Sequence, residues 1–210
     1  AIALISIAHP KYRAQLLREA VESHYLRPDM AEVEGKISIS APDLRTTHLL
    51  DDGTQINFRP IHPTDESRMR DLFYNLSQET LYYRFMSRMK YVPHQQIHDF
   101  VFIDHRKDYS MVGTVTEAYG ESIVAVGRYY LDQKTNQAAG AVVVQAGGQG
   151  RGIGKFMLGY LATIAKRNGI SGFTAEVLVT NKAMQSVIRN APFKVTSVPH
   201  EDVYSFRIGF

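Results

Sequence analysis

The feature that most constrains this chain is a glycine-rich loop that precedes an amphipathic helix. Six of the 15 glycines lie within residues 140–154, and apolar residues recur at helical spacing through residues 152–168. Backbone N–H groups in such a loop are accessible at the positive end of the helix dipole, where anions bind. Arg151 and Lys155 add positive charge beside them. We therefore expect the loop at residues 149–155 to bind a phosphate-bearing ligand.

Other glycine motifs fit this loop less well. A P-loop requires glycine where Gln149 stands and Ser or Thr where Phe156 stands, which argues against ATP hydrolysis. A dinucleotide fingerprint requires its third glycine at Lys155, and the order of elements predicts no parallel strand–helix–strand unit there. Residues 147–149 match the motif of peptide release factors over only three positions. A turn that uses glycine only for its backbone conformation remains an alternative.

Composition excludes several classes of protein. The 210 residues are 44% hydrophobic and 21% charged, which favours a globular chain with a packed core. The net charge is only +3, so we predict no nucleic-acid surface. Without cysteine there are no disulfides, zinc thiolates or thiol nucleophiles, which is typical of a cytoplasmic protein. The apolar run at residues 1–8 is too short for a membrane span of about 20 residues, so we expect no membrane association.

Residues 1–45 are predicted to form an appendage rather than a full domain. A strand is expected at residues 3–7, a helix at residues 11–25 and a short strand at residues 36–39 within a linker. The sequence starts without Met and inside the first expected strand. We therefore expect the chain to be part of a longer polypeptide.

Residues 46–210 are predicted to form one domain. Expected helices are 64–75, 77–89, one starting at Pro93, 152–168 and 181–188. Expected strands are 55–59, 110–117, 122–131, 138–145, 173–179, 193–198 and 203–208. The three central strands follow one another without helices, which indicates an antiparallel meander. The pattern predicts an α/β fold with a mixed, mostly antiparallel sheet and helices on both faces.

Residues 149–154 match the motif Q/R-x-x-G-x-G/A of the GNAT superfamily of N-acetyltransferases, which this chain resembles. The segment at residues 176–184 is similar to the strand and following Asn that help to hold coenzyme A in that family. Upstream, residues 52–54, 59–61, 65–66 and 81–85 resemble the acetyltransferase domain of bacterial protein lysine acetyltransferases. Residues 4–10, with Arg13 and residues 16–17, resemble the C-terminal end of acetyl-CoA hydrolase/transferases, which implies a fused partner domain.

The resemblance implies transfer of acetyl from acetyl-CoA to an amine, a protein lysine above all, by direct attack in a ternary complex. It implies that the central strand binds the pantetheine and polarises the thioester, while the glycine loop holds the pyrophosphate. The cofactor-binding residues implied in this way are Val142, Val143, Val144, Gln149, Gly150, Arg151, Gly152, Ile153, Gly154, Lys155, Asn181 and Met184.

Catalysis requires a carboxylate that accepts the proton of the attacking amine. Protein acetyltransferases of this group commonly have Glu where this chain has Ala139, and Ile188 stands where many GNAT enzymes keep a proton-donating Tyr. Glu176 and Glu117 are the substitute bases that we predict. The alternative is a catalytically weak acyl-CoA sensor that regulates a fused domain, and acetylation of a small-molecule amine is a third possibility.

Two other groups of residues could form functional sites, but an ordinary structural role explains each of them better. His94 and His98, with Asp99, Asp104 and His105, have spacing that could bind a metal, but exposed polar residues on a short helix explain it better, and we predict no metal site. Four tyrosines could line a substrate groove, although paired aromatic residues more often belong to the core. They are Tyr82, Tyr83, Tyr129 and Tyr130.

Overall fold

The computed structural model describes residues 1, 4–5, 8–26, 44–103, 108–118 and 120–210. Its described strands form one eight-stranded sheet in the order β1-β2-β3-β4-β5-β6-β8-β7. The strands are β1 (Thr46–Leu49), β2 (Gln55–Pro60), β3 (Asp108–Glu117), β4 (Gly120–Asp132), β5 (Gln137–Val144), β6 (Gly172–Leu178), β7 (Lys194–His200) and β8 (Val203–Gly209). Each neighbouring pair from β1 to β5 is antiparallel. This confirms the predicted meander of β3, β4 and β5, whereas β1 was not predicted.

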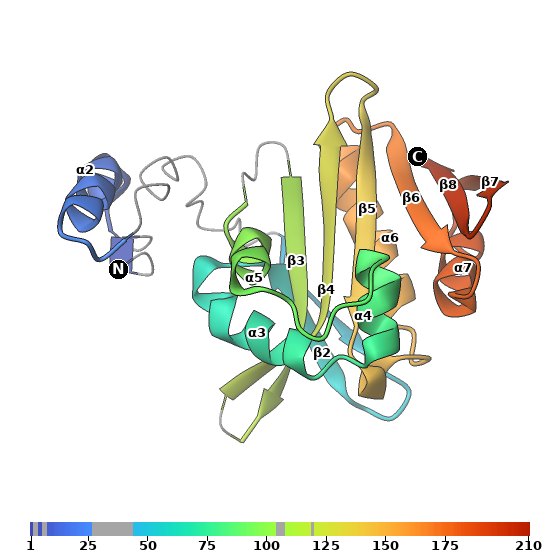
Figure 1. Ribbon diagram of the computed structural model, residues 1–210, viewed down its shortest axis with the longest axis horizontal. Helices are drawn as coiled ribbons and strands as arrows, with labels where there is room; N and C mark the ends of the chain where they lie inside the picture. Colours follow the sequence, from blue (N-terminus) through green and yellow to red (C-terminus); the bar gives the residue numbers. More distant parts are fainter. Residues whose placement is uncertain (2–3, 6–7, 27–43, 104–107, 119) are drawn as a thin grey trace.

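Helices cover both faces of this sheet, which confirms the predicted α/β class (Figure 1). One face carries α3 (Glu66–Tyr74), α4 (Gln78–Phe85) and α5 (His94–Val101), and the other carries α6 (Ile153–Arg167) and α7 (Lys182–Arg189). Each face has its own buried core, built around Phe73 and Phe100 on the first side and around Met157 and Phe173 on the second. We call the face under α3, α4 and α5 the front face.

The helix boundaries differ from the predictions mainly at α4. Ser77 begins this helix as expected, because its side chain accepts a hydrogen bond from the N–H of Thr80 at 3.1 Å. The helix ends at Phe85 rather than Met89, since Met86 adopts a left-handed conformation with φ 51°. Two short 3-10 turns, η3 (Pro63–Asp65) and η4 (Ala146–Gly148), precede α3 and α6.

One prediction about the sheet is wrong. β5 and β6 pair in parallel on either side of α6, so a parallel strand–helix–strand unit does surround the glycine loop. The pairing joins only three residues of each strand, and the last pair is Ala139 with Thr174. Beyond this pair β6 turns away from β5, while the other edge of β6 pairs with β8 along its whole length (Figure 1). We call this place the β5–β6 divergence.

The N-terminal segment forms a small helical unit at one end of the molecule (Figure 1). Its helix α2 (Pro10–Glu22) lies close to the predicted range, and Ile5 and Leu17 form a small buried cluster against which Phe102 packs. Leu4 and Ile5 are helical, so the expected strand at residues 3–7 is wrong there, and its other residues lie outside the described part. The expected strand at residues 36–39 also lies outside the described residues. No helix among the described residues is long and apolar enough to cross a membrane.

Candidate functional site

The glycine loop ends at the N-terminus of α6 with a row of unbonded amides. Gly152 takes the N-cap position with φ 86°, a conformation that glycine adopts without strain, and no side chain caps the helix. The first amide of α6 with a backbone acceptor is that of Phe156, which bonds to the carbonyl of Gly152 at 3.0 Å. Within the described residues, the N–H groups of residues 150–155 have no recorded acceptor. Such a helix end binds anions.

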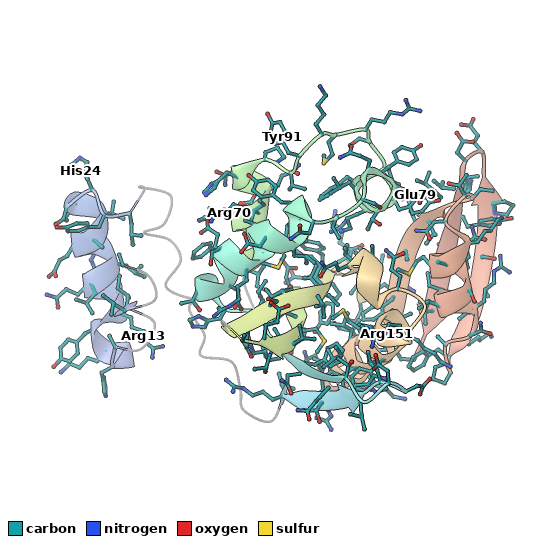
Figure 2. All side chains as sticks on the ribbon, turned by 90° about the horizontal axis from the view of Figure 1, so that it is seen from below. Arg13, His24, Arg70, Glu79, Tyr91 and Arg151 are labelled. Carbon is teal, nitrogen blue, oxygen red and sulfur yellow. The ribbon has the colours of Figure 1, made fainter. Side chains whose placement is uncertain are left out.

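The two basic residues of the loop have different environments. Arg151 makes an ion pair with Asp52 and contacts Thr54 at 3.2 Å, so its guanidinium fixes the loop to the turn between β1 and β2 (Figure 2). Hydrogen bonds from Thr54, and then from Arg151, hold the pKa of Asp52 below its usual value. Lys155 is exposed and forms no ion pair with any described residue. Lys155 is therefore the cation that is left to face a ligand at this helix end.

The edge of β5 presents backbone groups toward the β5–β6 divergence. Gln145 donates its N–H to the carbonyl of Val124 on β4, at 2.9 Å. Because bonded pairs alternate along an antiparallel ladder, Val143 also bonds to β4, whereas the N–H and C=O groups of Val142 and Val144 point away from it. No described strand pairs with β5 on that side beyond Ala139. Of the three predicted strand residues, Val142 therefore presents its N–H and C=O groups, and Val144 its N–H group, toward the divergence, whereas Val143 does not. The carbonyl of Val144 also points there but accepts a hydrogen bond from the side chain of Gln149.

Helix α4 spans the divergence on the front face. Gln149 donates to the carbonyl of Val144 at 3.1 Å and to the hydroxyl of Thr80 at 3.3 Å, which connects the loop to the start of α4. One turn later, the hydroxyl of Tyr83 donates to the carboxylate of Glu79 at 2.8 Å and lies 3.4 Å from the carbonyl of Thr180, just after β6. These contacts attach α4 to both strands where they separate.

The structure does not bring the two predicted bases together. Thr174 pairs with Ala139, so Glu176, two residues further along β6, lies on the same front face as Ala139. Its side chain is exposed at the divergence. Glu117 is exposed at the end of β3, where it pairs with Gly120 at the hairpin tip, and β4 and β5 separate β3 from β6. Glu176 is therefore the better placed carboxylate.

Asn181 and Met184 are brought together by the start of α7. The side-chain oxygen of Asn181 accepts the N–H of Met184 at 3.0 Å, which caps this helix. Both side chains are half-buried. The segment that resembles a cofactor contact thus has a structural role as a helix cap in this chain.

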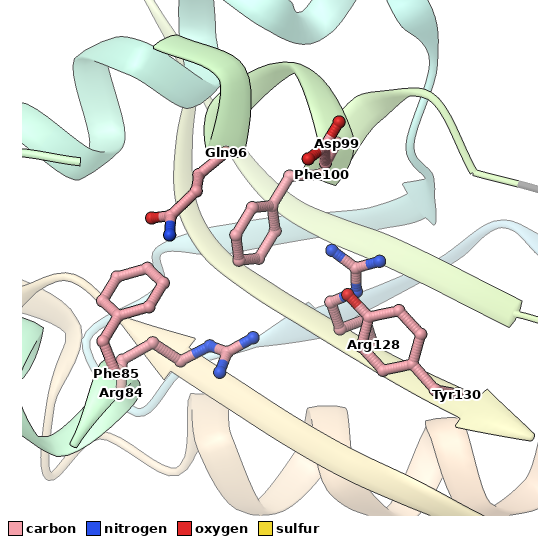
Figure 3. A pocket seen from close by; sticks show the side chains of 7 residues that line it. All are labelled: Arg84, Phe85, Gln96, Asp99, Phe100, Arg128 and Tyr130. Carbon is pink, nitrogen blue, oxygen red and sulfur yellow. The ribbon is translucent and has the colours of Figure 1, made fainter. Parts of the chain in front are cut away.

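A pocket of about 350 Å³ opens on the front face between α4, α5 and β4 (Figure 3). It is lined by Arg84, Phe85, Gln96, Asp99, Phe100, Arg128 and Tyr130. Ala139 is the residue of β5 directly opposite Tyr130, so the pocket lies beside the position where the resemblance to protein acetyltransferases implies a base. Burial raises the pKa of Tyr130, although the nearby arginines oppose this effect.

The sequence analysis missed Arg84 and Arg128 as site residues. Arg84 lies within residues 81–85, but their resemblance to acetyltransferases implied no role for it, and Arg128 belongs to no motif. Strand spacing alone does not show that β4 passes beneath α4 and α5. Of the four tyrosines, Tyr130 lines the pocket, whereas Tyr129 is buried in the core with 2% exposure. His94 pairs with Glu66 at 2.9 Å and His98 stacks on Phe102, while Asp104 and His105 lie outside the described residues.

Comparison with known proteins agrees with this geometry. The family model described as the acetyltransferase (GNAT) family matches residues 70–191, which is more than half of the chain. The chain belongs to the GNAT family of acetyltransferases. Members of this family use acetyl-CoA as the acetyl donor.

Individual relatives support the same GNAT assignment. An acetyltransferase of Pseudomonas aeruginosa is 27% identical over 138 residues, which are 66% of this chain and 74% of that protein. Acetyltransferase Pat of Mycolicibacterium smegmatis is 32% identical over 138 residues, and this match spans 65% of this chain but only 40% of Pat. The crystal structure of the GNAT domain of S. lividans PAT has a TM-score of 0.74 and 25% identity, and the match covers 81% of this chain and 99% of that domain.

Proposed function

We propose that residues 46–210 transfer an acetyl group from acetyl-CoA to a primary amine, with a protein lysine as the acceptor. The observation that carries this proposal is the row of unbonded amides at the start of α6 beside the free edge of β5. Membership of the GNAT family supports the acetyl transfer, and the resemblance to bacterial protein lysine acetyltransferases supports the acceptor. The lack of cysteine is consistent with activity in the cytoplasm.

The residues of the site fit acetyl-CoA. Its two linked phosphates match the amides of residues 150–155 and the charge of Lys155. The amides of its pantetheine arm match the N–H and C=O groups of Val142 and the N–H group of Val144, which point away from β4. Acetyl-CoA supplies the acetyl group as an activated thioester. An N–H group of β5 that donates to the thioester oxygen would stabilise the negative charge that develops there.

The acceptor amine must lose a proton to attack, and Glu176 is our candidate base. Glu176 lies on the front face at the divergence, on the same side of the sheet as Ala139. Because the carboxylate is exposed, it can accept the proton directly or through one water molecule and pass it to solvent.

The proposal is tested first by calorimetric titration with acetyl-CoA, with ATP and NAD as control ligands. Gly152→Asp places a negative charge among the amides of α6 and should weaken acetyl-CoA binding at least tenfold, an effect on the order of 1.4 kcal/mol. Gly169→Asp is the matched control, because Gly169 has φ 76° at the other end of α6 and open space around it. Equal loss of binding in both variants would contradict the proposed site.

A second candidate function is a catalytically weak sensor of acyl-CoA that regulates a fused acetyl-CoA hydrolase/transferase domain. Ala139 favours it, because the carboxylate that related enzymes have there is missing. A sensor should bind acetyl-CoA as described above and release no coenzyme A with any amine acceptor. Release of coenzyme A that depends on a lysine peptide would exclude this function.

A further inference from the structure

The front-face pocket contains two guanidinium groups that have no acidic partner among the described residues. Arg128 is 4% exposed, and its guanidinium carbon lies 4.0 Å from the ring centroid of Tyr130 and 4.7 Å from that of Phe100. Arg84 is half-buried, and its guanidinium carbon lies 5.3 Å from the centroid of the same Phe100 ring (Figure 3). Within the described part of the chain, neither arginine forms an ion pair.

This arrangement is costly without a ligand. A buried charge requires a partner or hydrogen bonds, and the Nε atom of Arg128 has no acceptor among the described residues. Burial lowers the pKa of Arg84 and of Arg128, because both guanidinium groups have lost much of their hydration. The residues of β5 opposite Arg128 and Tyr130 are Ala141 and Ala139, which offer no compensating charge.

The acidic residues near the pocket do not replace that partner. Asp99 lines the pocket, but its exposed carboxylate accepts a hydrogen bond from Gln95 at 3.0 Å and lies 3.7 Å from His98. Asp99 and Asp108 act on Arg128 only through their longer-range charge, which is weaker than the effect of burial. The exposed edge of the pocket therefore carries the negative charge of Asp99, whereas Arg84 and Arg128 make its interior positively charged.

We infer that the front-face pocket binds a carboxylate group carried by the acceptor, with Arg84 and Arg128 as the anion-binding residues. Guanidinium groups match carboxylates in geometry and can hold them with two parallel hydrogen bonds. The volume of about 350 Å³ admits a side chain of the size of glutamate together with water. This inference rests on the proposed function, because the pocket adjoins Ala139 and so lies where the acceptor would approach.

The first experiment measures binding without acetyl-CoA. Glutarate is titrated into the full chain by calorimetry, and glutaramide, which has the same shape without charge, is the control ligand. We expect glutarate alone to bind and Arg84→Gln to weaken its binding at least about tenfold, as expected for loss of a charge-assisted contact. Arg88→Gln is the matched control, because Arg88 is exposed just after α4 and does not line the pocket. Arg128→Gln serves as a second variant if circular dichroism shows that it folds.

The second experiment compares acceptors that differ only in a carboxylate. Free lysine is compared with cadaverine, which lacks the carboxylate of lysine, and a peptide with Glu beside its lysine is compared with the Gln analogue. A higher kcat/KM for the acidic member of either pair, lost in Arg84→Gln but not in Arg88→Gln, supports the inference. The pair that shows the effect identifies the carboxylate source as a free small molecule or a protein segment.

The inference and the proposed function can fail separately. If glutarate does not bind, or binds equally to the wild type and Arg84→Gln, the inference is overturned even when cadaverine is acetylated. If glutarate binds through Arg84 but no amine is acetylated, the anion site is supported and the acetyltransferase proposal is not. Equal acetylation of both members of each pair also overturns the inference.

Discussion

At the scale of single residues, Ala139 stands where the resemblance to protein lysine acetyltransferases implies a carboxylate. Ala139 is exposed on the front face beside Tyr130 and cannot accept a proton. Glu176 lies on the same face of the neighbouring strand, where β5 and β6 have already separated. Ala139 of β5 therefore cannot act as a base, and Glu176 of β6 is the carboxylate that we propose in its place.

Glu176→Gln should lower kcat about a hundredfold, because general-base catalysis contributes on the order of 10² to 10⁴ in rate. The affinity for acetyl-CoA should stay unchanged, since the substitution keeps the size of an exposed side chain. Stopped-time assays of coenzyme A release give kcat, and calorimetry gives the affinity. Glu117→Gln, at the distant hairpin tip, should keep most of the activity. A larger loss in Glu117→Gln than in Glu176→Gln would make Glu117 the base.

The sequence predicted the loop residues of the site better than those of the pocket. Residues 149–155 are consecutive, so their spacing is itself a signal, and glycine at a positive φ is needed at the N-cap of α6. Arg84 and Arg128 are 44 positions apart and come together only because α4 and β4 both place an arginine against the Phe100 ring of α5. The spacing of apolar residues in α4 and in β4 does not predict such a contact.

At the scale of secondary structure, the approximate bounds of β2 to β8 were predictable, whereas β1 and the direction of one pairing were not. The meander from β3 to β5 follows from alternating apolar residues joined by short turns. The parallel contact of β5 with β6 depends on α6, whose 15 residues return the chain to the same edge of the sheet. Only three residue pairs carry this contact, and this brevity is what leaves the edge of β5 free.

Asn181, at the start of α7, caps the helix and could also bind the cofactor, and two substitutions distinguish these roles. Asn181→Ala removes the acceptor of the Met184 amide and should lower the free energy of unfolding by about 1 kcal/mol. Asn181→Asp keeps an acceptor and should retain most of the stability. Urea unfolding measures the stability of each variant, and calorimetry measures the affinity for acetyl-CoA. If the affinity falls in both variants while stability falls only in Asn181→Ala, Asn181 also contacts the cofactor.

At the scale of the whole molecule, one buried carboxylate joins β2, α3 and β4. The side chain of Asp65 is 1% exposed and contacts Arg59 through both oxygens, at 2.6 and 2.8 Å. Arg68 bonds to Asp65 at 3.2 Å, and Arg59 also bonds to Glu121 on β4 at 2.9 Å. In the sequence, Asp65 was notable only as part of an expected helix and of a segment that resembles bacterial acetyltransferases. Its burial follows from the packing of α3 on the sheet, which a local pattern cannot specify.

The charge of Asp65 should control how acid affects stability. Burial opposes the charged form, but hydrogen bonds and charge from Arg59 hold the pKa of Asp65 below its usual value overall. Its contribution to stability is therefore complete above the unfolded pKa of about 3.9 and is lost as the pH falls through the lower folded pKa.

Asp65→Asn should lower the free energy of unfolding by about 3 kcal/mol at neutral pH, because it leaves the buried side of Arg59 without a countercharge. Urea unfolding of wild type and variant across the acidic range should show this difference shrinking as Asp65 in the wild type becomes protonated. Asp71→Asn, an exposed change on the following helix α3, should stay within about 0.5 kcal/mol of wild type. A difference between wild type and Asp65→Asn that is constant with pH would mean that the shape of the side chain, not its charge, holds β2 and β4 to α3.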